Sequence, residues 1–385
     1  MVEPNQSILW QDIMSNFPTT SKLLPVFTEA EPECITIIPS YRCSASCPEC
    51  CFSSSPAIKY RMGQNDLIRL IQNIRKRFQH LDYIVISGGE PTLLGNDLVD
   101  AIKEISSLDL GSRIVTNGSW AKSEDSTNKW ITQLKAAGLN ELNLSTGDEH
   151  QMFVPLDCVA RAAYHSVQAD ILTLIVVEGK ETSHFRIGDL HNHPLIKNII
   201  EDENLHKNLI LLTNVWVPFH TETNITNDKT KASAQGCDNI FENLAINPYG
   251  CVYSCCGLTM EYIQECKIGH IDSDDLLPIY QDQYKDIFKL WIWLDGTKYI
   301  FERLQEKVER KLEVLSPHAC AICAQLYQTK EFQTKLIEII EDNAKQIMFR
   351  AVIKAKMTGR IPNVLKGDIN GQQKRSYPVM GSPIT

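Results

Sequence analysis

Three cysteines in one short segment constrain this chain more than any other feature: Cys43-Ser-Ala-Ser-Cys47-Pro-Glu-Cys50. They follow an apolar run at 34–39 that has the length of a β-strand. Three thiolates at these spacings can hold three irons of a cubane [4Fe–4S] cluster, and no fourth ligand at matching spacing follows. One iron then stays open, and an open metal position is suited to chemistry. The alternative is a zinc or structural thiolate site completed by Cys51 or Cys34.

Composition limits the kind of protein this can be. The 385 residues allow two domains. The net charge of −9 argues against a general nucleic-acid or anionic-membrane binder. The N-terminus lacks the layout of a signal peptide, and the most apolar runs have only the length of strands. Thirteen cysteines, an odd number in clusters, indicate metal sites in a reducing compartment. We therefore expect a cytoplasmic protein with no nucleic-acid or membrane partner.

From residue 34 onward, strand-like runs alternate with helix-period segments. This alternation predicts a parallel sheet covered by crossover helices, with ligands at the carboxyl ends of the strands. Six strands predict an open, partial (β/α)6 TIM-type barrel rather than a closed eightfold one. The expected strands are 35–39, 83–87, 113–116, 142–145, 171–177 and 209–217, and the expected helices are 67–78, 97–108, 129–137 and 157–168.

The end of the second expected strand carries Gly88-Gly89-Glu90-Pro91. Glycines there let the backbone approach a ligand closely, and the adjacent carboxylate can receive an ammonium group. The alternative is that this motif forms a tight turn and binds no ligand. Two further polar motifs follow at later strand ends: Val115-Thr116-Asn117-Gly118, and Leu142-Asn-Leu-Ser145 with Asp148 shortly after.

With these motifs in order, residues 34–218 resemble the radical S-adenosylmethionine (radical SAM) superfamily. The resemblance implies a [4Fe–4S] cluster on Cys43, Cys47 and Cys50, with S-adenosylmethionine chelating the open iron. Reductive cleavage then yields a 5′-deoxyadenosyl radical that removes a hydrogen atom from a substrate carbon. The gap between the serine and the acid of the fourth strand is wider than is usual in the family, which puts the role of Asp148 in doubt. The implied cofactor-binding residues are Gly88, Gly89, Glu90, Pro91, Thr116, Asn117, Ser145, Asp148 and Val176.

A second group of cysteines lies beyond residue 218. A β-hairpin is expected from 244–246 and 252–253 around the turn Asn247-Pro-Tyr-Gly250, and Cys320-Ala-Ile-Cys323 follows much later. A hairpin and a close pair can make a closed four-thiolate site for a cluster or for zinc.

The pattern Cys-x12-Gly-x4-Cys that starts at Cys237 is similar to the opening of the SPASM and twitch extensions of radical SAM enzymes. No cysteine follows Cys323, which favours the shorter twitch form with one auxiliary [4Fe–4S] cluster. Structural zinc remains the alternative. The expected ligands are Cys237, Cys255, Cys320 and Cys323; Cys256 could replace Cys255, and Cys251 or Cys266 could enter the shell.

We therefore expect four segments. They are an N-terminal extension (1–33) with a short helix at 8–14, a radical SAM core (34–218), an auxiliary-cluster domain with a β-hairpin and helices (219–330), and a C-terminal helix with a mobile tail (331–385). Helices are expected at 279–294, 300–315 and 330–356 from their apolar spacing.

The resemblance also implies partners and outcomes. A reductant such as flavodoxin or ferredoxin would supply the electron. The substrate would be a ribosomally made peptide, which is oxidised, crosslinked or epimerised, or alternatively a small metabolite. A separate leader-peptide recognition protein is possible, because 33 residues hold no such domain. Cys256 and Cys251 are surplus to a four-ligand site and are candidate hydrogen donors. A non-catalytic iron–sulfur or zinc binding module is the alternative of another class.

Overall fold

A computed structural model describes residues 27, 30–180, 182–215, 235–257, 260–272, 275–308, 311–312, 318–328 and 330–360. The expected helix at 8–14, most of the expected N-terminal extension and the tail lie outside these residues. By internal contacts the chain divides into two units. Glu33–Lys229 and Ala245–Gly250 contribute to the first, here called the barrel unit; Thr230–Leu244 and Cys251–Val379 contribute to the second, the C-terminal unit.

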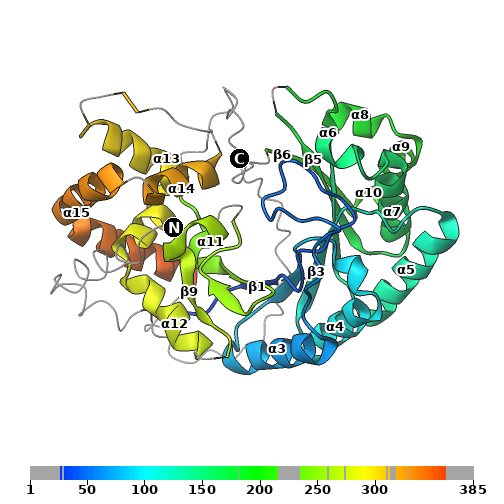
Figure 1. The fold of residues 1–385 in the computed structure, drawn as a ribbon, viewed down its shortest axis with the longest axis horizontal. Coiled ribbons are helices and arrows are strands. Elements are labelled where there is room, and N and C mark those ends of the chain that lie inside the picture. Colours follow the sequence, from blue (N-terminus) through cyan, green and yellow to red (C-terminus); the bar gives the residue numbers. More distant parts are fainter. Residues whose placement is uncertain are drawn as a thin grey trace. The chain divides into compact units, whose positions relative to one another are not determined.

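The barrel unit is built on six parallel strands. Their order is β6-β5-β4-β3-β2-β1, so the sheet is open, and the predicted partial α/β barrel is confirmed (Figure 1). Because all six run in one direction, their carboxyl ends share one edge. The strands are β1 (Cys34–Ile37), β2 (Tyr83–Ile86), β3 (Gly111–Thr116), β4 (Glu141–Thr146), β5 (Leu172–Glu178) and β6 (Leu209–Asn214).

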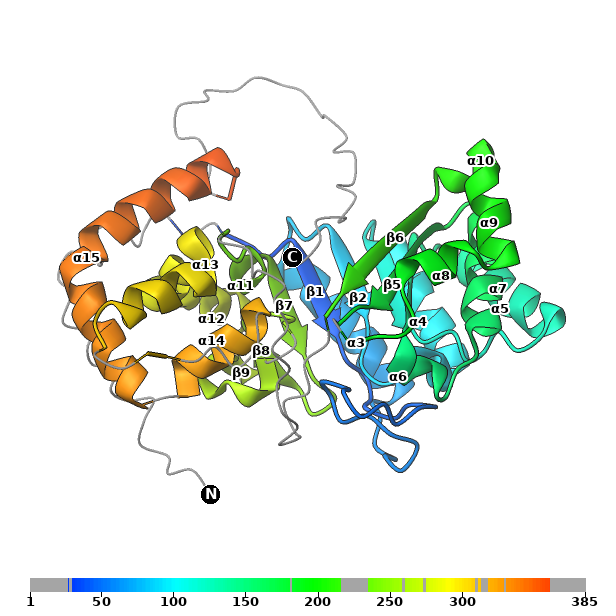
Figure 2. The same ribbon diagram turned by 90° about the horizontal axis from the view of Figure 1, so that it is seen from above.

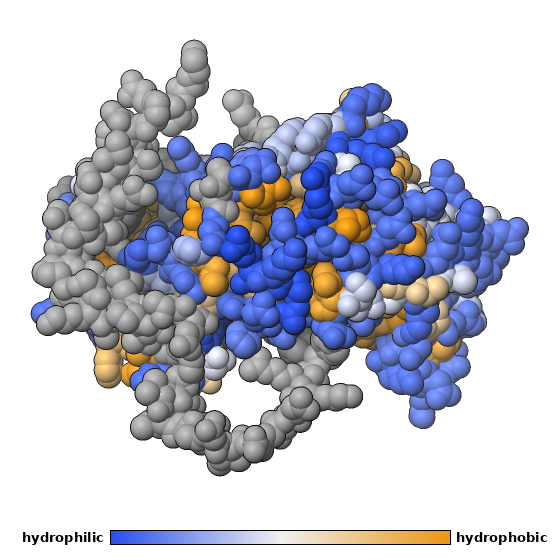
Figure 3. Space-filling view, turned by 90° about the horizontal axis from the view of Figure 1, so that it is seen from below, coloured by the Kyte–Doolittle hydropathy of each residue, from blue (hydrophilic) through white to orange (hydrophobic). Residues whose placement is uncertain are grey.

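Helices between the strands cover the outer face of this sheet (Figure 2). The helices Gln64–Arg77, Asn96–Ser107 and Leu156–Gln168 each bury an apolar stripe at helical spacing, and the side turned to solvent is mainly hydrophilic on the face seen in Figure 3. The three short helices between β5 and β6 were not expected from the sequence. The elements are α3 (Gln64–Arg77), η2 (Pro91–Leu94), α4 (Asn96–Ser107), α5 (Glu124–Ala137), α6 (Asp148–Gln151), α7 (Leu156–Gln168), α8 (Ile187–His191), α9 (Pro194–Glu201) and α10 (Glu203–His206).

Strand alternation separates the two faces of the sheet. In β4, Leu142 and Leu144 are fully buried, whereas Asn143 and Ser145 are half-buried. Successive side chains of a strand point to opposite faces, so the polar pair lies on the face away from the helices. Ser145 is in register with Val176 of β5, which places two predicted cofactor-binding residues side by side.

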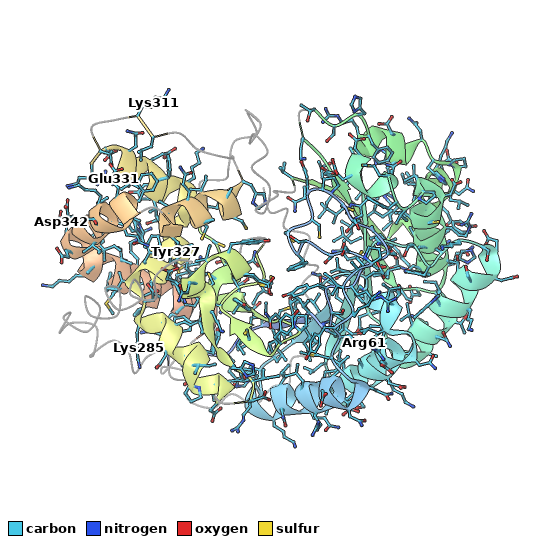
Figure 4. All side chains as sticks on the ribbon, in the orientation of Figure 1. Arg61, Lys285, Lys311, Tyr327, Glu331 and Asp342 are labelled. Atoms are coloured by element: carbon cyan, nitrogen blue, oxygen red, sulfur yellow. The ribbon has the colours of Figure 1, made fainter. Side chains whose placement is uncertain are left out.

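The predicted hairpin and a further group of helices follow the six parallel strands in the chain. β7 and β8 are hydrogen-bonded neighbours joined by the expected turn, in which the Gly250 N–H donates to the Asn247 carbonyl (3.0 Å). β8 also pairs antiparallel with β9. Tyr327, labelled in Figure 4, packs in the helical core with its ring centroid 4.9 Å from that of Phe288. The elements are α11 (Asn239–Glu242), β7 (Asn243–Ile246), β8 (Cys251–Tyr253), η3 (Met260–Tyr262), η4 (Gln264–Cys266), β9 (Lys267–His270), α12 (Leu276–Asp282), η5 (Gln283–Lys285), α13 (Ile287–Gln305), α14 (Ala319–Gln328) and α15 (Lys330–Met357).

Two of the three helices expected near the C-terminus are wrong as single helices. The segment 279–294 is divided among α12, η5 and α13, because the Asp286 carboxylate accepts hydrogen bonds from the N–H groups of Phe288 and Lys289 and starts a new helix there. α13 then kinks at Gly296 (φ 75°) and ends at Gln305, well before residue 315. The helix expected at 330–356 is confirmed as α15. None of the helices in the described part of the chain combines the length and apolarity needed to cross a bilayer.

Candidate metal centres

The three-cysteine loop begins just past the carboxyl end of β1. The Cys43 N–H donates to the Ser55 carbonyl (3.2 Å), and the Cys50 N–H donates to the Cys47 carbonyl (3.1 Å). Two sulfurs also accept backbone hydrogen bonds: Cys43 Sγ from Ala45 and Cys50 Sγ from Ser54, both at 3.4 Å. The loop is therefore a hydrogen-bonded turn with sulfur atoms as acceptors.

The three thiols lie close enough to influence one another. Burial raises the pKa of Cys43 to about 11, and the charges of Glu90 and Cys50 add to it. Burial also raises the pKa of Cys47 to about 12, followed by the charges of Cys50 and Cys43. Thiolates gathered in this way repel one another unless a metal compensates their charge. The donor set therefore fits an iron–sulfur cluster.

Of the two cysteines considered as a fourth ligand, Cys34 lies away from the loop. It begins β1, whereas the loop follows the other end of this strand, and four extended residues span roughly 10 Å. Its thiol acts electrostatically on Arg113 of β3. Cys51 is half-buried directly beside Cys50.

The two glycines at the end of β2 pack against the segment that leads into this loop. A Cβ at Gly88 would lie 2.6 Å from the Ser40 carbonyl oxygen, and one at Gly89 would lie 2.1 Å from that of Arg42. The Gly89 N–H donates to Ser40 (3.0 Å), and the Glu90 N–H donates to Arg42 (2.8 Å). The diglycine therefore positions the cysteine loop, a contact that the sequence did not predict.

The Glu90 carboxylate accepts hydrogen bonds from other groups of the protein. This carboxyl is 3% exposed. Its Oε1 accepts from the Thr92 N–H (3.1 Å), the Thr92 hydroxyl (2.5 Å) and the Thr116 hydroxyl (2.7 Å), and its Oε2 accepts from the Asn117 N–H (2.8 Å). Burial raises the pKa of Glu90, whereas these donors lower it. The carboxylate therefore joins η2, which begins at the buried Pro91, to the end of β3.

Asn117 connects the end of β3 to the cysteine loop. Its side-chain amide donates to Cys43 Sγ (3.5 Å) and to the Ser44 hydroxyl (3.1 Å). Hydrogen bonds to cluster sulfurs are one of the means by which proteins set cluster potentials. Sequence reasoning placed Asn117 in the cofactor site but did not foresee this contact with the ligand Cys43.

Asp148 contacts another loop of the protein. Its two carboxylate oxygens accept hydrogen bonds from the backbone N–H groups of His184 (2.6 Å) and Phe185 (2.9 Å). These bonds lower its pKa against the opposing effect of burial. In this structure Asp148 holds the segment after β5, and the contact with a ribose or carboxylate that the resemblance implied stays a prediction.

An ion-pair network, missed from the sequence, joins the cysteine loop to the end of β5. Lys180 pairs with Glu49, which lies between Cys47 and Cys50, and with Glu178 (Nζ to Oε1, 3.3 Å). Burial raises the pKa of Glu178 to about 7, and the charge of Glu149 adds to it. The sequence does show Glu49 between two predicted ligands, but it does not show that Lys180, far away along the chain, pairs with it.

The C-terminal unit gathers a second group of thiols. Burial contributes most to raising the pKa of Cys323, and the charges of Cys266, Cys320 and Cys237 add to it. Cys266 is hydrogen-bonded through its thiol to Cys255. The structure thus brings together the four predicted ligands and adds Cys266, which the sequence gave only as an alternative.

Further distances support this grouping. A Cβ built at Gly257 would lie 3.2 Å from the Cys320 sulfur and 3.6 Å from the Cys255 sulfur. The charge of Cys256 acts on Cys237, whereas the thiol of Cys251, on β8, is hydrogen-bonded to Tyr253. Within the described ranges, no group of three or more His, Cys, Asp or Glu side chains is close enough together to bind a single metal ion as the chain stands. The six thiols that converge are those of Cys237, Cys255, Cys256, Cys266, Cys320 and Cys323.

The fold and the loop define a class: an open α/β barrel with a three-thiol site at the carboxyl ends of its strands. Residues 37–146 match the family model of the radical SAM superfamily. The matched residues include the cysteine loop and the glycine motif on which the sequence-based resemblance to this superfamily rested.

The chain is also similar to individual proteins. YydG of Bacillus subtilis (strain 168), a protein named for peptide biosynthesis, is 27% identical over 183 residues. The match covers 43% of this chain and spans 57% of YydG, little more than half its length. The structure of anSMEcpe with bound AdoMet has a TM-score of 0.51 and 14% identity, covering 83% of this chain and 99% of the other. SuiB of Streptococcus suis, bound to its precursor peptide SuiA, has a TM-score of 0.41 and 16% identity, covering 66% of this chain and 65% of SuiB.

Proposed function

We propose that this protein is a radical SAM enzyme that modifies a ribosomally made peptide. The observation that carries the proposal is the loop of Cys43, Cys47 and Cys50, in which the sulfurs of Cys43 and Cys50 accept hydrogen bonds from the chain and the charge of Cys50 acts on both Cys43 and Cys47. When bound there, a [4Fe–4S] cluster with S-adenosylmethionine supplies an organic radical that removes a hydrogen atom from a substrate carbon.

The chain's own residues would hold this centre in place. Gly88 and Gly89 fix the segment before Cys43, and Asn117 donates to its sulfur. The Glu49–Lys180 ion pair ties the other half of the loop to the end of β5. A centre supported from several strand ends is rigid, and rigidity keeps a reactive radical directed at its substrate.

The polar ends of β2 to β5 are the proposed binding site for S-adenosylmethionine. Gly88, Gly89 and Pro91 would lie at the methionine end, with Thr116 and Asn117 beside them. Ser145 and Val176, paired in register, would face the nucleoside. Glu90 and Asp148 would support this site from behind, because their carboxylates are already hydrogen-bonded within the protein.

The second thiol group is the proposed site of one auxiliary cluster. Four of the six gathered thiols suffice for a closed site. We retain Cys237, Cys255, Cys320 and Cys323 as ligands, with Cys266 as a competing candidate because its thiol is bonded to that of Cys255. A reductant such as flavodoxin or ferredoxin would deliver electrons to the enzyme.

Peptide modification is supported by the relative YydG, which is named for peptide biosynthesis. The small-metabolite alternative has no observation in its favour here. A separate leader-peptide recognition protein would be a partner if the substrate carries a leader.

The test begins with anaerobic reconstitution of the full chain with iron and sulfide. With S-adenosylmethionine and dithionite it should release 5′-deoxyadenosine, and the Cys43→Ala, Cys47→Ala and Cys50→Ala variants should release none. Peptides from short reading frames beside the gene are then added in deuterated buffer. Uptake of a solvent deuteron indicates epimerisation, and loss of hydrogen indicates oxidation or crosslinking. Absence of 5′-deoxyadenosine under all conditions contradicts the proposal and favours a binding module.

Cys256 is the proposed hydrogen donor if the reaction is epimerisation, with Cys251 as the second candidate. The Cys256→Ala variant should still form 5′-deoxyadenosine in the presence of peptide but give little product. Product at the normal rate rules out Cys256 as the donor and directs the test to Cys251.

A further inference from the structure

A buried lysine lies beside the thiols of the C-terminal unit. Lys289, near the start of α13, is only 4% exposed. Lysine is almost never this buried unless a negative charge compensates its ammonium group. Among the described residues, no carboxylate forms an ion pair with it, and the nearby Asp286 accepts hydrogen bonds from the helix N-terminus instead. Any compensating charge must therefore lie beyond ion-pair distance.

Two thiols and one carboxyl group interact electrostatically with Lys289. The ammonium group of Lys289 acts electrostatically on Cys266, which is buried, and on Cys323, and it opposes the rise in pKa that burial and neighbouring thiols cause at both. Burial raises the pKa of Glu265, the residue before Cys266, and the charge of Lys289 opposes this rise. The ammonium group thus acts on two of the six gathered thiols and on one carboxyl next to them.

The backbone of α13 places the lysine on the side of the helix that meets these thiols. The Ile292 carbonyl, three residues after Lys289, accepts a hydrogen bond from the Cys237 N–H (3.0 Å). A Cβ at Gly236 would lie 2.0 Å from the Trp293 carbonyl oxygen, so the chain before Cys237 runs directly along this helix. Residues three apart share a helix face, and Lys289 therefore lies on the face that contacts the cysteine-bearing segment.

We propose that the positive charge of Lys289 sets the reduction potential of the auxiliary cluster. This inference rests on the proposed auxiliary cluster. A cubane held by four thiolates is negatively charged, and one-electron reduction adds a further negative charge. A buried ammonium group stabilises the reduced form more than the oxidised form, because Coulomb energies are large where water is excluded. Lys289 therefore makes the cluster easier to reduce through its charge alone, and no bond forms or breaks.

The experiment isolates the auxiliary site in the full chain. A background carrying Cys43→Ala, Cys47→Ala and Cys50→Ala lacks the first cluster, so the remaining iron reports the second. Its midpoint potential is measured by titration with dithionite, followed by absorbance and electron paramagnetic resonance. Lys289→Met, which keeps the length of the side chain but not its charge, should shift the potential to more negative values. Lys289→Arg should remain near the background value.

Lys285→Met is the matched control. Lys285 belongs to the neighbouring η5, its side chain is 54% exposed and it pairs with Asp282 (Figure 4). Removal of this charge should leave the potential unchanged, since water screens it. Glu265→Gln removes a negative charge near the same thiols and should shift the potential in the positive direction.

Each result decides the matter. An unchanged potential in Lys289→Met with normal iron content overturns the proposal. If that variant loses its iron, Glu265→Gln decides, and an unchanged potential there overturns it. A background protein without iron overturns both the auxiliary cluster and the role of Lys289. Release of 5′-deoxyadenosine by the unaltered protein tests the proposed activity separately.

Discussion

At the scale of single residues, Glu90 shows how a motif can be recognised before its role is understood. Its carboxylate accepts four hydrogen bonds and is almost fully buried. Each acceptor oxygen is matched to donors, so a replacement that introduces a donor leaves buried groups unsatisfied.

The Glu90→Gln variant should therefore be less stable by about 1 to 3 kcal/mol. The amide NH₂ group would face an N–H or hydroxyl donor that now lacks an acceptor. Denaturant unfolding measures the change. Glu201→Gln is the control, because that side chain is 62% exposed and its pairing with Lys197 is at the surface. Equal stability of the two variants would show that the buried hydrogen bonds contribute little.

His150 gives a prediction about pH. Burial lowers its pKa from 6.5 to about 4. Between these values the unfolded chain binds a proton that the folded chain does not, so stability is full above about pH 6.5 and is lost as pH falls toward 4. The loss should amount to about 1 to 3 kcal/mol.

The His150→Gln variant should lose this dependence between pH 4 and 6.5, whereas the exposed His191→Gln control on α8 should retain it. Denaturant unfolding across that range measures the slope. A wild-type slope that survives in His150→Gln assigns the effect to other groups.

At the scale of elements, the end of β2 and the segment after β1 are packed backbone to backbone. Gly89 leaves no space for a side chain, because its Cβ would lie 2.1 Å from a carbonyl oxygen that cannot rotate away. The position of the cysteine loop therefore depends on this one missing methyl group.

Gly89→Ala should displace the loop and reduce the iron bound by reconstituted protein by roughly half, since one of two proposed clusters is affected. Gly188→Ala is the control, because nothing lies within 4 Å of its Cβ position. Iron and sulfide analysis measures the result. Full iron content in Gly89→Ala would mean that the two segments can separate without loss of the site.

At the scale of the whole molecule, the two units should depend differently on metal. In the C-terminal unit the thiols of α14 meet those near β8 and β9, so a metal there would tie separate elements together. In the barrel unit the parallel strands β1 to β6 are joined by their own hydrogen bonds.

Removal of iron should therefore increase amide hydrogen exchange in Ala319–Gln328 by roughly tenfold or more, while Glu141–Thr146 of β4 remains protected. Mass spectrometry of peptides before and after chelation measures this difference. Equal exchange in α14 with and without iron would contradict a structural contribution of the metal.

The sequence by itself determined the local features: the strand–helix alternation, the open barrel, the three-cysteine loop and the glycines after β2. These features depend on residue periodicity and spacing, which can be read within a short segment of the chain. It missed the division of 279–294, because a single Asp286 carboxylate caps a new helix within a continuous apolar pattern.

Only the tertiary structure decided which distant groups meet. Asn117 reaches Cys43, Lys180 reaches Glu49, and Lys289 acts on Cys266 and Cys323. Each partnership joins residues on different elements, whose approach depends on packing rather than on spacing along the chain. Which residues could bind a cluster was therefore evident from the sequence, whereas the groups that support and tune those residues emerged only when the strands and helices were assembled.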